Sequence, residues 1–360
     1  MRGDPTMVLL GIDAHKRTHT VVAVDEHGRK LGERTVGTTT ADHLDLLVWA
    51  SRFGAERRWA VEDCRHLSRR LERDLLAAGQ QVVRVPPKLM ANTRRAARTY
   101  GKSDPIDALA VARAALREPD LPAARLDGPA RELQLLIDHR DDLVAERTRV
   151  INRLRWHLHE LDPALTPPAR SLSRAPARHL AAVEAFLSRF DGDGNKVVVD
   201  LAGQLAARVR ELNAQIDQLE DDLAPRVRRC APSLLALTGC GVLTAAKLVG
   251  ETADVRRFRS KDAYARHNGT APLPVWSANK QRYRLSRSGN RQLNLGLHRI
   301  AITQARHHPD AQRYLARRRA NGDTPTEAIR ALKRRLSDVV YRALLTDASV
   351  TDEAGQAAAA

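Results

Sequence analysis

The sequence is poor in aromatic residues, in cysteine and in long apolar runs, and each shortage excludes a class of protein. Phe, Trp and Tyr make up 4% of the 360 residues, although apolar residues together reach 43%, enough for ordinary cores. The cysteines Cys64, Cys230 and Cys240 form no Cys-x-x-Cys pair, which excludes a disulfide framework or a zinc site and predicts reduced, cytosolic thiols. No run approaches the length of a membrane-spanning helix and no signal peptide is present, so we expect no membrane partner.

Acidic residues are outnumbered by basic residues, and the resulting excess of positive charge indicates what kind of partner the chain binds. Lys and Arg total 60 against 43 Asp and Glu, which gives a net charge of +17 at pH 7. Most of these cations are Arg, whose planar guanidinium suits bidentate contacts with phosphate. The charge predicts a polyanionic partner, most simply DNA or RNA, although a ribosomal or membrane-surface protein would share it.

The pattern of apolar residues predicts three domains with loose tails. Residues 8–125 alternate strands and helices, which indicates a mixed sheet with helices packed against it. Strands are expected at 8–13, 19–25, 30–36, 59–62 and 81–85, with a hairpin turn at Gly28 and helices at 40–52, 67–78 and from 104. We expect Thr40 and Asp104 to be helix N-caps. Residues 1–7 and 347–360 are expected to be disordered.

The middle and C-terminal domains are predicted to be helical. Region 129–228 contains helices at 129–161 and 198–223, the second with the spacing of a coiled-coil seam. It serves either as an arm for dimerisation or nucleic-acid binding, or as a helical hairpin packed on its own domain. Region 232–346 holds two helices around a turn at Gly239 and Gly241, similar to helix-hairpin-helix motifs whose amides contact a DNA phosphate. Its last helices are expected at 291–306 and 324–345, with a basic run at 313–319 between them.

Four acids stand at the exits of predicted strands and at the start of a helix. Asp13 ends the first strand, Glu62 ends the strand at 59–62, and Asp104 and Asp107 lie three residues apart in the first turn of a helix. Spacing of three residues puts the last two on one helix face, where both can point at one ion. A lone acid at a strand end is usually only a polar residue where the strand emerges into a loop, but the order Asp, Glu, Asp-x-x-Asp predicts a divalent metal site. Asp63 is the rival for the second position, and we prefer Glu62.

Basic residues flank these acids and surround a serine in the C-terminal domain. Arg94, Arg95 and Arg98 lead toward the acids and would carry a DNA phosphate past them, although a solvated surface has the same composition. Ser277 lies in a loop before a cationic stretch, and a serine that attacks a phosphodiester needs such cations. The cations expected to bind nucleic acid are Lys16, Arg94, Arg95, Arg98, Lys102, Lys280, Arg282, Arg284, Arg287 and Arg291. By itself a loop serine is seldom a nucleophile.

These motifs together resemble the transposases of insertion sequence family 110 and its 1111 subgroup, relatives of the Piv-type DNA invertases. The resemblance spans roughly residues 8–345. Its markers are Gly11-Ile-Asp-Ala-His-Lys16, Val61-Glu62, Lys102-Ser-Asp-Pro-Ile-Asp-Ala108, Leu237-Thr-Gly-Cys-Gly241, Asn268-Gly-Thr-Ala-Pro272 and Arg287-Ser-Gly-Asn-Arg291.

The resemblance implies a RuvC-like, ribonuclease-H-type first domain whose acids, Asp13, Glu62, Asp104 and Asp107, bind Mg²⁺ or Mn²⁺. It also implies a C-terminal serine, here Ser277, that forms a covalent bond to DNA. This chain reads Trp276-Ser-Ala-Asn279 where the family often has Ser-Ser-Gly or Ser-Gly-Gly, so Ser286 and Ser288 are fallback candidates. Members work on donor and target DNA with a structured RNA from their element, as homo-oligomers from dimer to tetramer. We therefore expect a cytoplasmic, nucleoid-associated bacterial enzyme.

Two other readings follow from the same residues. A junction nuclease would use the same acids with water as the nucleophile, so that its cleavage would survive replacement of Ser277. A DNA-binding relative whose acids no longer catalyse would still bind DNA after all four were replaced.

Overall fold

The computed structural model describes residues 7–62, 67–96, 103–118, 121, 123–124, 128–165, 172–173, 176–190, 195–277, 280–284 and 289–359. The chain divides into two compact units. One unit contains residues 1–128 together with 254–267, and we call it the sheet unit. The other, the helical unit, contains residues 129–253 and 268–360.

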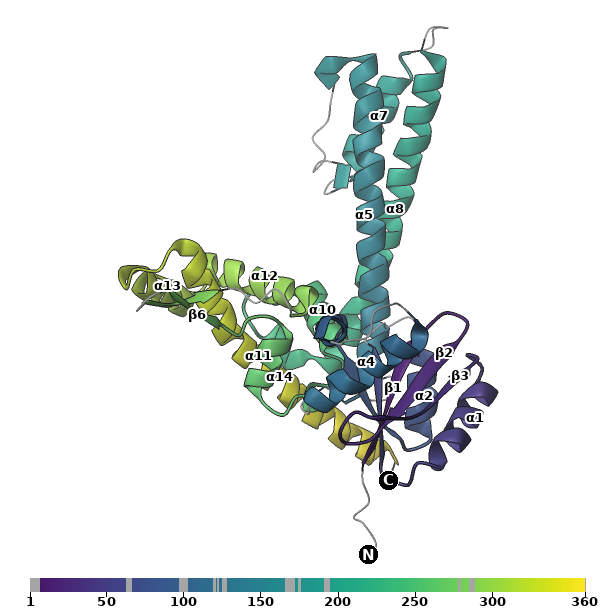
Figure 1. Cartoon of the computed structure of the whole chain (residues 1–360). Coiled ribbons are helices and arrows are strands. Elements are labelled where there is room, and N and C mark those ends of the chain that lie inside the picture. Colours follow the sequence, from purple (N-terminus) through teal and green to yellow (C-terminus); the bar gives the residue numbers. More distant parts are fainter. Residues whose placement is uncertain are drawn as a thin grey trace, which may run out of the picture. The chain divides into compact units, whose positions relative to one another are not determined.

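The sheet unit is built on five strands in the order β3-β2-β1-β4-β5 (Figure 1). β1 pairs antiparallel with β2, which pairs antiparallel with β3, whereas β4 and β5 continue the sheet parallel to β1. The strands are β1 (Val8–Ala14), β2 (His19–Val24), β3 (Lys30–Val36), β4 (Arg57–Glu62) and β5 (Gln81–Val85). The predicted mixed sheet of ribonuclease-H type is confirmed, as is the turn at Gly28, where φ is +75°.

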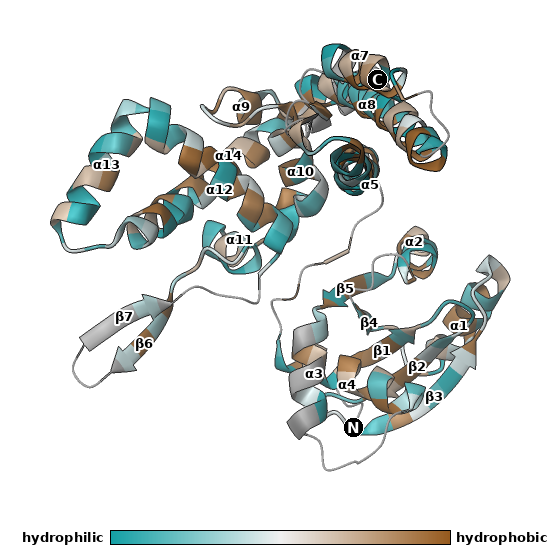
Figure 2. Ribbon diagram, turned by 90° about the horizontal axis from the view of Figure 1, so that it is seen from above, coloured by the Kyte–Doolittle hydropathy of each residue, from teal (hydrophilic) through white to brown (hydrophobic). Residues whose placement is uncertain are grey.

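Helices cover both faces of this sheet because side chains alternate along each strand (Figure 2). α1 (Thr40–Ser51) and α2 (Arg69–Ala77) pack Leu46, Leu71 and Leu75 against Ile12, Val21 and Val61 on one face. On the other face α4 (Asp104–Arg117) packs alanines and Val111 against Leu9, Val22 and Val83. α3 (Pro87–Ala96), which the sequence analysis did not predict, precedes α4.

Two predicted helix caps are wrong by one residue. The N-cap of α1 is Thr39, not Thr40, because Asp42 lies three residues after Thr39 and closes a capping box with it. The N-cap of α4 is Ser103, whose backbone is extended, so Asp104 is already the first helical residue. Asp104 and Asp107 still share the first turn, and the predicted i,i+3 relation between them is preserved.

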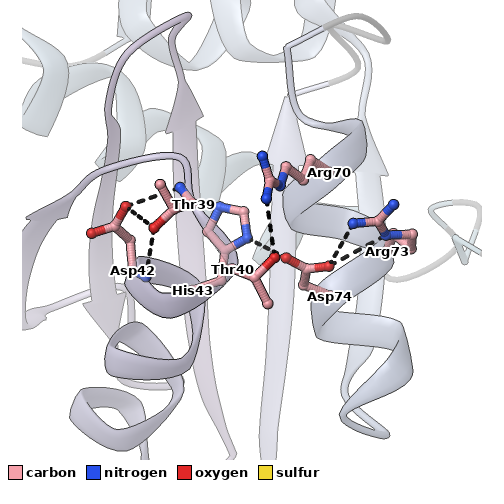
Figure 3. Close-up of polar contacts among 7 residues, drawn as sticks. All are labelled: Thr39, Thr40, Asp42, His43, Arg70, Arg73 and Asp74. Carbon is pink, nitrogen blue, oxygen red and sulfur yellow. Dashed lines mark hydrogen bonds and ion pairs between the residues drawn. The ribbon is translucent and has the colours of Figure 1, made fainter.

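A buried histidine joins α1 to α2 beneath the sheet (Figure 3). Nδ1 of His43 lies 2.7 Å from Oδ2 of Asp74, and Arg73 contacts the other carboxylate oxygen at 3.2 Å. The His43 ring also lies 5.5 Å, centroid to centroid, from the ring of His19 at the start of β2. This polar cluster lies on the face of the sheet opposite α4.

In the helical unit, three helices lie side by side as a bundle (Figures 1 and 2). α5 (Pro129–Leu161) and α8 (Lys196–Cys230) run antiparallel, since Arg140 bonds Glu220 while Arg208 bonds Glu146. α7 (Pro176–Leu187) completes a core that includes Leu154, Leu180, Phe186, Val209 and Leu212. The predicted long helices are confirmed, and α8 continues past the predicted end at 223, through Pro225, to Cys230. Within the chain they form a hairpin with its own core.

The rest of the helical unit is a second helical cluster with a β-hairpin. It contains α9 (Pro232–Leu235), α10 (Val242–Thr252), β6 (Leu273–Ser277), β7 (Lys280–Arg284), α12 (Arg291–His307), α13 (Pro309–Ala320) and α14 (Pro325–Ala359). α13 replaces the basic run predicted between helices, and α14 continues to Ala359, where we predicted a disordered tail. A short helix also occurs in this unit at η1 (Pro163–Leu165), and two more, η2 (Val255–Arg257) and α11 (Lys261–His267), belong to the sheet unit. No helix in the described residues is long and apolar enough to cross a membrane.

Candidate active site

The site forms where β1 passes directly against α4. A Cβ on Gly11 would lie 2.3 Å from the carbonyl oxygen of Ala108 and 2.4 Å from the amide nitrogen of Ala112. Only a residue without a side chain permits this approach. It brings the end of β1, with Asp13, against the first turn of α4, with Asp104 and Asp107.

Glu62 joins these acids through the parallel register of β1 and β4. Ile12 pairs with Val61, so Asp13 and Glu62 are the next residues of two adjacent strands that end at the same edge. Asp13 is 5% exposed and Asp107 8%, whereas the side chain of Asp104 is 53% exposed. The four acids predicted from the sequence therefore lie in one place, two of them buried.

Burial and the crowding of the carboxylates raise the pKa values of the two strand acids, Asp13 and Glu62. Burial raises the pKa of Asp13; the nearby His15 lowers it, and repulsion from Asp107 and Asp104 raises it further. Burial also raises the pKa of Glu62, and repulsion from Asp13 and Asp107 adds to the rise. Neighbouring carboxylates that resist ionisation form a site whose electrostatics favour a cation.

His15 is a site residue that the sequence analysis missed. Its Nε2 atom lies 3.0 Å from Oδ2 of Asp13 and 3.4 Å from Oδ1 of Asp104, so one nitrogen contacts two of the acids. Ligand atoms of His15, Asp13 and Asp104 all lie within 4.8 Å of one another. The only sequence signal for this role is the Asp-x-His spacing at the end of the strand. This spacing does not predict the contact unless the conformation of the turn that follows is known.

Asp107 has a cationic neighbour in α3. Nε of Arg94 lies 3.0 Å from Oδ1 of Asp107 and forms an ion pair with it, but among the described residues this buried oxygen accepts no hydrogen bond. A buried carboxylate oxygen normally has one. An oxygen in this state, among three further carboxylates, fits a divalent cation such as Mg²⁺ or Mn²⁺, which prefers oxygen ligands.

The other predicted cations near the acids are placed only in part. Lys16 lies exposed in the turn between β1 and β2. Arg95 belongs to α3, but its side chain is outside the described residues. Arg98, Lys102 and the rival acid Asp63 lie outside the described residues altogether.

The predicted glycine turn lies between α9 and α10. Gly239 has a φ of +89°, and a Cβ there would lie 2.8 Å from Cβ of Thr303 in α12. Gly241 is the N-cap of α10. The first helix of the motif is the four-residue α9, and Pro232 begins it directly after α8 ends.

Ser277 is the last residue of β6, where its backbone pairs with Lys280 at the start of β7. It is therefore in a strand rather than in the predicted loop. The register also pairs Arg282 with Val275 and Arg284 with Leu273. The side chains of Ser277, Lys280, Arg282 and Arg284 are outside the described residues, as is all of 285–288, which includes Ser286, Arg287 and Ser288. Arg291 is the first residue of α12.

Comparison with known proteins matches both ends of the chain to transposases. A family profile described as transposase matches residues 10–163, and a second, the IS116/IS110/IS902 transposase family, matches residues 231–316. The 44.8 kDa protein of insertion element IS116 from Streptomyces clavuligerus is 30% identical over 94% of this chain and 95% of its own. The 42 kDa protein of IS900 from Mycobacterium paratuberculosis is 28% identical over 98% and 99%. Among solved structures, T. thermophilus RuvC in complex with a Holliday junction substrate covers 31% of this chain at 20% identity, with a TM-score of 0.25.

Proposed function

The chain belongs to the IS116/IS110/IS902 family of transposases, and on this premise we propose that it cuts and rejoins DNA strands to move an insertion element. The observation that carries the proposal is the convergence of Asp13, Glu62, Asp104 and Asp107 at one edge of the sheet. A structural role does not explain this, because crowding buried carboxylates opposes folding.

We propose that these four acids hold Mg²⁺ or Mn²⁺. A bound divalent cation supplies Lewis-acid polarisation of the phosphate and stabilises developing charge on its oxygens. The contribution of the chain is positional: β1, β4 and α4 are packed elements, and Gly11 fixes the distance between two of them. His15, whose Nε2 contacts both Asp13 and Asp104, is a further candidate ligand at this site.

Ser277 is the proposed nucleophile. Its Oγ would attack the phosphorus and form a serine–phosphate ester, the bond from phosphorus to the leaving deoxyribose oxygen would break, and that oxygen would take up a proton. The new strand end would reverse this step on the serine ester, so no external energy source is needed. Support comes from family membership and from the strand register, which assigns positions 280, 282 and 284 to the same face of the hairpin as position 277. Those positions are Lys, Arg and Arg, cations suited to a transferring phosphate.

We further propose that the partners are donor DNA, target DNA and an RNA from the element, handled by a homo-oligomer in which acids and serine come from different subunits. A net charge of +17 suits a chain that neutralises two kinds of nucleic acid. The basic residues of α3 and the glycine turn before α10 are the proposed contacts with their phosphates. A DNA substrate would place the enzyme at the bacterial nucleoid.

The main alternative is a metal-dependent junction nuclease in which water replaces Ser277. The acid cluster favours it as strongly as it favours a transposase, since both need the same cation site. A second alternative is a catalytically inactive DNA-binding relative, which the intact set of four acids argues against.

The test uses full-length protein, Mg²⁺, RNA transcribed from the element's flank and end-labelled junction DNA. A denaturing gel is expected to show DNA bound covalently to wild-type protein and to lose this band in Ser277→Ala. Mass spectrometry of the adduct identifies the serine, and an adduct at Ser286 or Ser288 would reassign the nucleophile. Cleavage that persists in Ser277→Ala without any adduct would establish the water nuclease instead. Asp13→Asn should lose both cleavage and adduct, whereas loss of neither would exclude the acid cluster.

A further inference from the structure

The helical unit contains a cavity at the root of the β6–β7 hairpin, and none of the residues that line it has been assigned a role above. Its volume is about 620 Å³, within the range of roughly 300–1,000 Å³ that is usual for small-molecule sites. Its walls come from α12, α13 and α14, from the loop between α13 and α14, from residues 269–272 before β6, and from Tyr283 on β7.

Cations outnumber acids in this lining. Five side chains are basic, namely Arg318, Arg330, Lys333, Arg334 and Arg335, and two are acidic, Asp323 and Glu327. Both acids are occupied, because Arg318 lies 2.5 Å from Asp323 and Arg330 lies 3.9 Å from Glu327. Arg334 pairs with Asp338 one turn further along α14. Within the described part of the chain, Lys333 and Arg335 form no ion pair.

Lys333 is the most informative of these cations because it is buried. It is 7% exposed, and its Nζ donates a hydrogen bond to the neutral amide oxygen of Asn294 at 2.5 Å. Burial lowers the pKa of Lys333, and the positive charge of Arg330 lowers it further. A buried ammonium normally has an anionic partner. An anion entering the cavity would supply one.

Aromatic side chains stand beside these cations. Tyr283 is 56% exposed at the rim, in a chain with only 4% aromatic residues. The ring of Tyr314 also lines the cavity and is less exposed, with Cζ of Arg335 4.5 Å from its centroid. An exposed aromatic ring close to unpaired cations is the combination that binds a nucleobase together with its phosphate.

Hydrogen bonds join the wall of the cavity, at Thr270 and Asn294, to the root of the hairpin. Asn268 accepts a hydrogen bond from Thr270 N at 3.1 Å and donates to Ser337 at 2.8 Å, while Asn294 donates to the Asn268 carbonyl at 2.9 Å. A Cβ on Gly289 would lie 2.2 Å from the backbone nitrogen of Gly269, so the two ends of the hairpin segment touch. Whatever binds in the cavity therefore also lies against the root of the hairpin that carries position 277.

We propose that this cavity binds one unpaired nucleotide of the strand that passes the β6–β7 hairpin, with its base on Tyr283 and its phosphate at Lys333 and Arg335. The inference rests on the proposed function only in that the substrate is a nucleic acid. The strand is DNA or RNA, since base and phosphate are common to both. Holding one nucleotide here fixes the register of the strand along the hairpin.

The experiment measures binding of fluorescein-labelled hexathymidylate and hexauridylate to the full-length protein by fluorescence anisotropy. Tyr283→Leu is expected to weaken binding about tenfold, the effect of losing one stacked base, while Tyr283→Phe retains the ring and the affinity. Lys333→Met should weaken binding and lower the salt dependence by about one ion. Methionine has a similar volume and removes a buried charge, so this variant should fold; melting temperatures check it.

Arg313→Met is the matched control. It removes one positive charge from α13 at a side chain that is 75% exposed and outside the lining, and should change affinity less than twofold. A loss confined to the DNA or to the RNA probe identifies the strand. The inference is overturned if Tyr283→Leu and Lys333→Met bind both probes as tightly as Arg313→Met does.

The covalent-adduct assay separates this inference from the proposed function. Ser277→Ala should bind both probes normally, because the cavity does not use the serine. If wild type forms the adduct and the cavity variants bind the probes normally, nucleotide binding in the cavity is refuted and the proposed recombinase function stands. If those variants bind the probes more weakly and wild type forms no adduct, nucleotide binding in the cavity stands and the serine is refuted as the nucleophile.

Discussion

Gly11→Ala is predicted to inactivate the enzyme although it changes no polar group. The added Cβ would lie 2.3 Å from the Ala108 oxygen, whereas ordinary van der Waals contact begins at 3.4 Å, so β1 and α4 must separate by about 1 Å. The atoms that it meets first belong to the α4 backbone, and no side-chain rotation relieves the contact. The separation moves Asp13 away from the acids of α4.

Two magnitudes follow from this displacement. Overpacking of this kind costs about 1–3 kcal/mol of folding free energy, so the sheet unit should still fold. A shift of about 1 Å in catalytic groups costs on the order of 100-fold in rate. We therefore expect a folded protein whose melting temperature falls by several degrees, whose stabilisation by Mg²⁺ is lost, and whose DNA cleavage is about 100-fold slower.

The assay compares three variants by circular dichroism, by Mg²⁺-dependent melting temperature and by cleavage rate. Gly203→Ala is the control, because a Cβ at this position of α8 meets no atom of the described residues within 4 Å and should stabilise the helix by about 1 kcal/mol. Adding Ala112→Gly to Gly11→Ala should not restore activity, since the backbone contacts remain. Full activity of Gly11→Ala, or its rescue by Ala112→Gly, would refute the argument that this backbone approach sets the site.

Three further predictions concern buried charge. Burial lowers the pKa of His19 from 6.5 to about 4. Between these pH values the unfolded chain binds a proton at His19 and the folded chain does not, so the free energy of unfolding should fall by about 3 kcal/mol as the pH drops from 6.5 to 4. Acid denaturation followed by circular dichroism should show this loss reduced in His19→Gln. Because the pKa of Glu62 is raised, its ionised form opposes folding, and Glu62→Gln should melt higher than wild type in EDTA at pH 8, with the difference shrinking toward pH 4. Lys247 is 4% exposed and 2.5 Å from Asp141, so Asp141→Asn should cost about 1–3 kcal/mol in chemical denaturation, whereas Lys247→Met costs less.

Elements with strong local signals were predictable from the sequence. The strand at Gln81–Val85 and the helix at Pro129–Leu161 have the predicted bounds, because a double proline ends the first and a proline begins the second. α13 was missed because its sequence is rich in arginine and mostly hydrophilic, as the teal of its ribbon in Figure 2 shows, and only Ala311 and Leu315 are buried. Its fold depends on packing against neighbouring helices, which composition does not reveal.

The candidate site was predictable to the level of residue type and order, but not of contact. Strand ends and a helix start are local features, and parallel strands bring their ends together, so the four acids follow from the chain itself. The ion pair of Arg94 with Asp107 needed α3, which was not predicted, and the contact of His15 with Asp104 joins residues 89 positions apart. Long-range contacts of this kind carry no periodic signal.

The acids and the serine of the proposed reaction are positioned by different kinds of structure. Asp13 and Glu62 extend from a five-stranded sheet, and Asp104 and Asp107 from a helix packed on one of its faces, so all four are positioned by backbone that belongs to a packed core. Ser277 lies on a two-stranded hairpin, and such a hairpin is only marginally stable unless it packs against something else. Two of its aromatic side chains, Trp276 and Tyr283, are 67% and 56% exposed, so apolar surface that would stabilise a hairpin is left free. A nucleic-acid strand that stacks on these rings would supply the missing contacts, so the hairpin should become more stable when its substrate is bound.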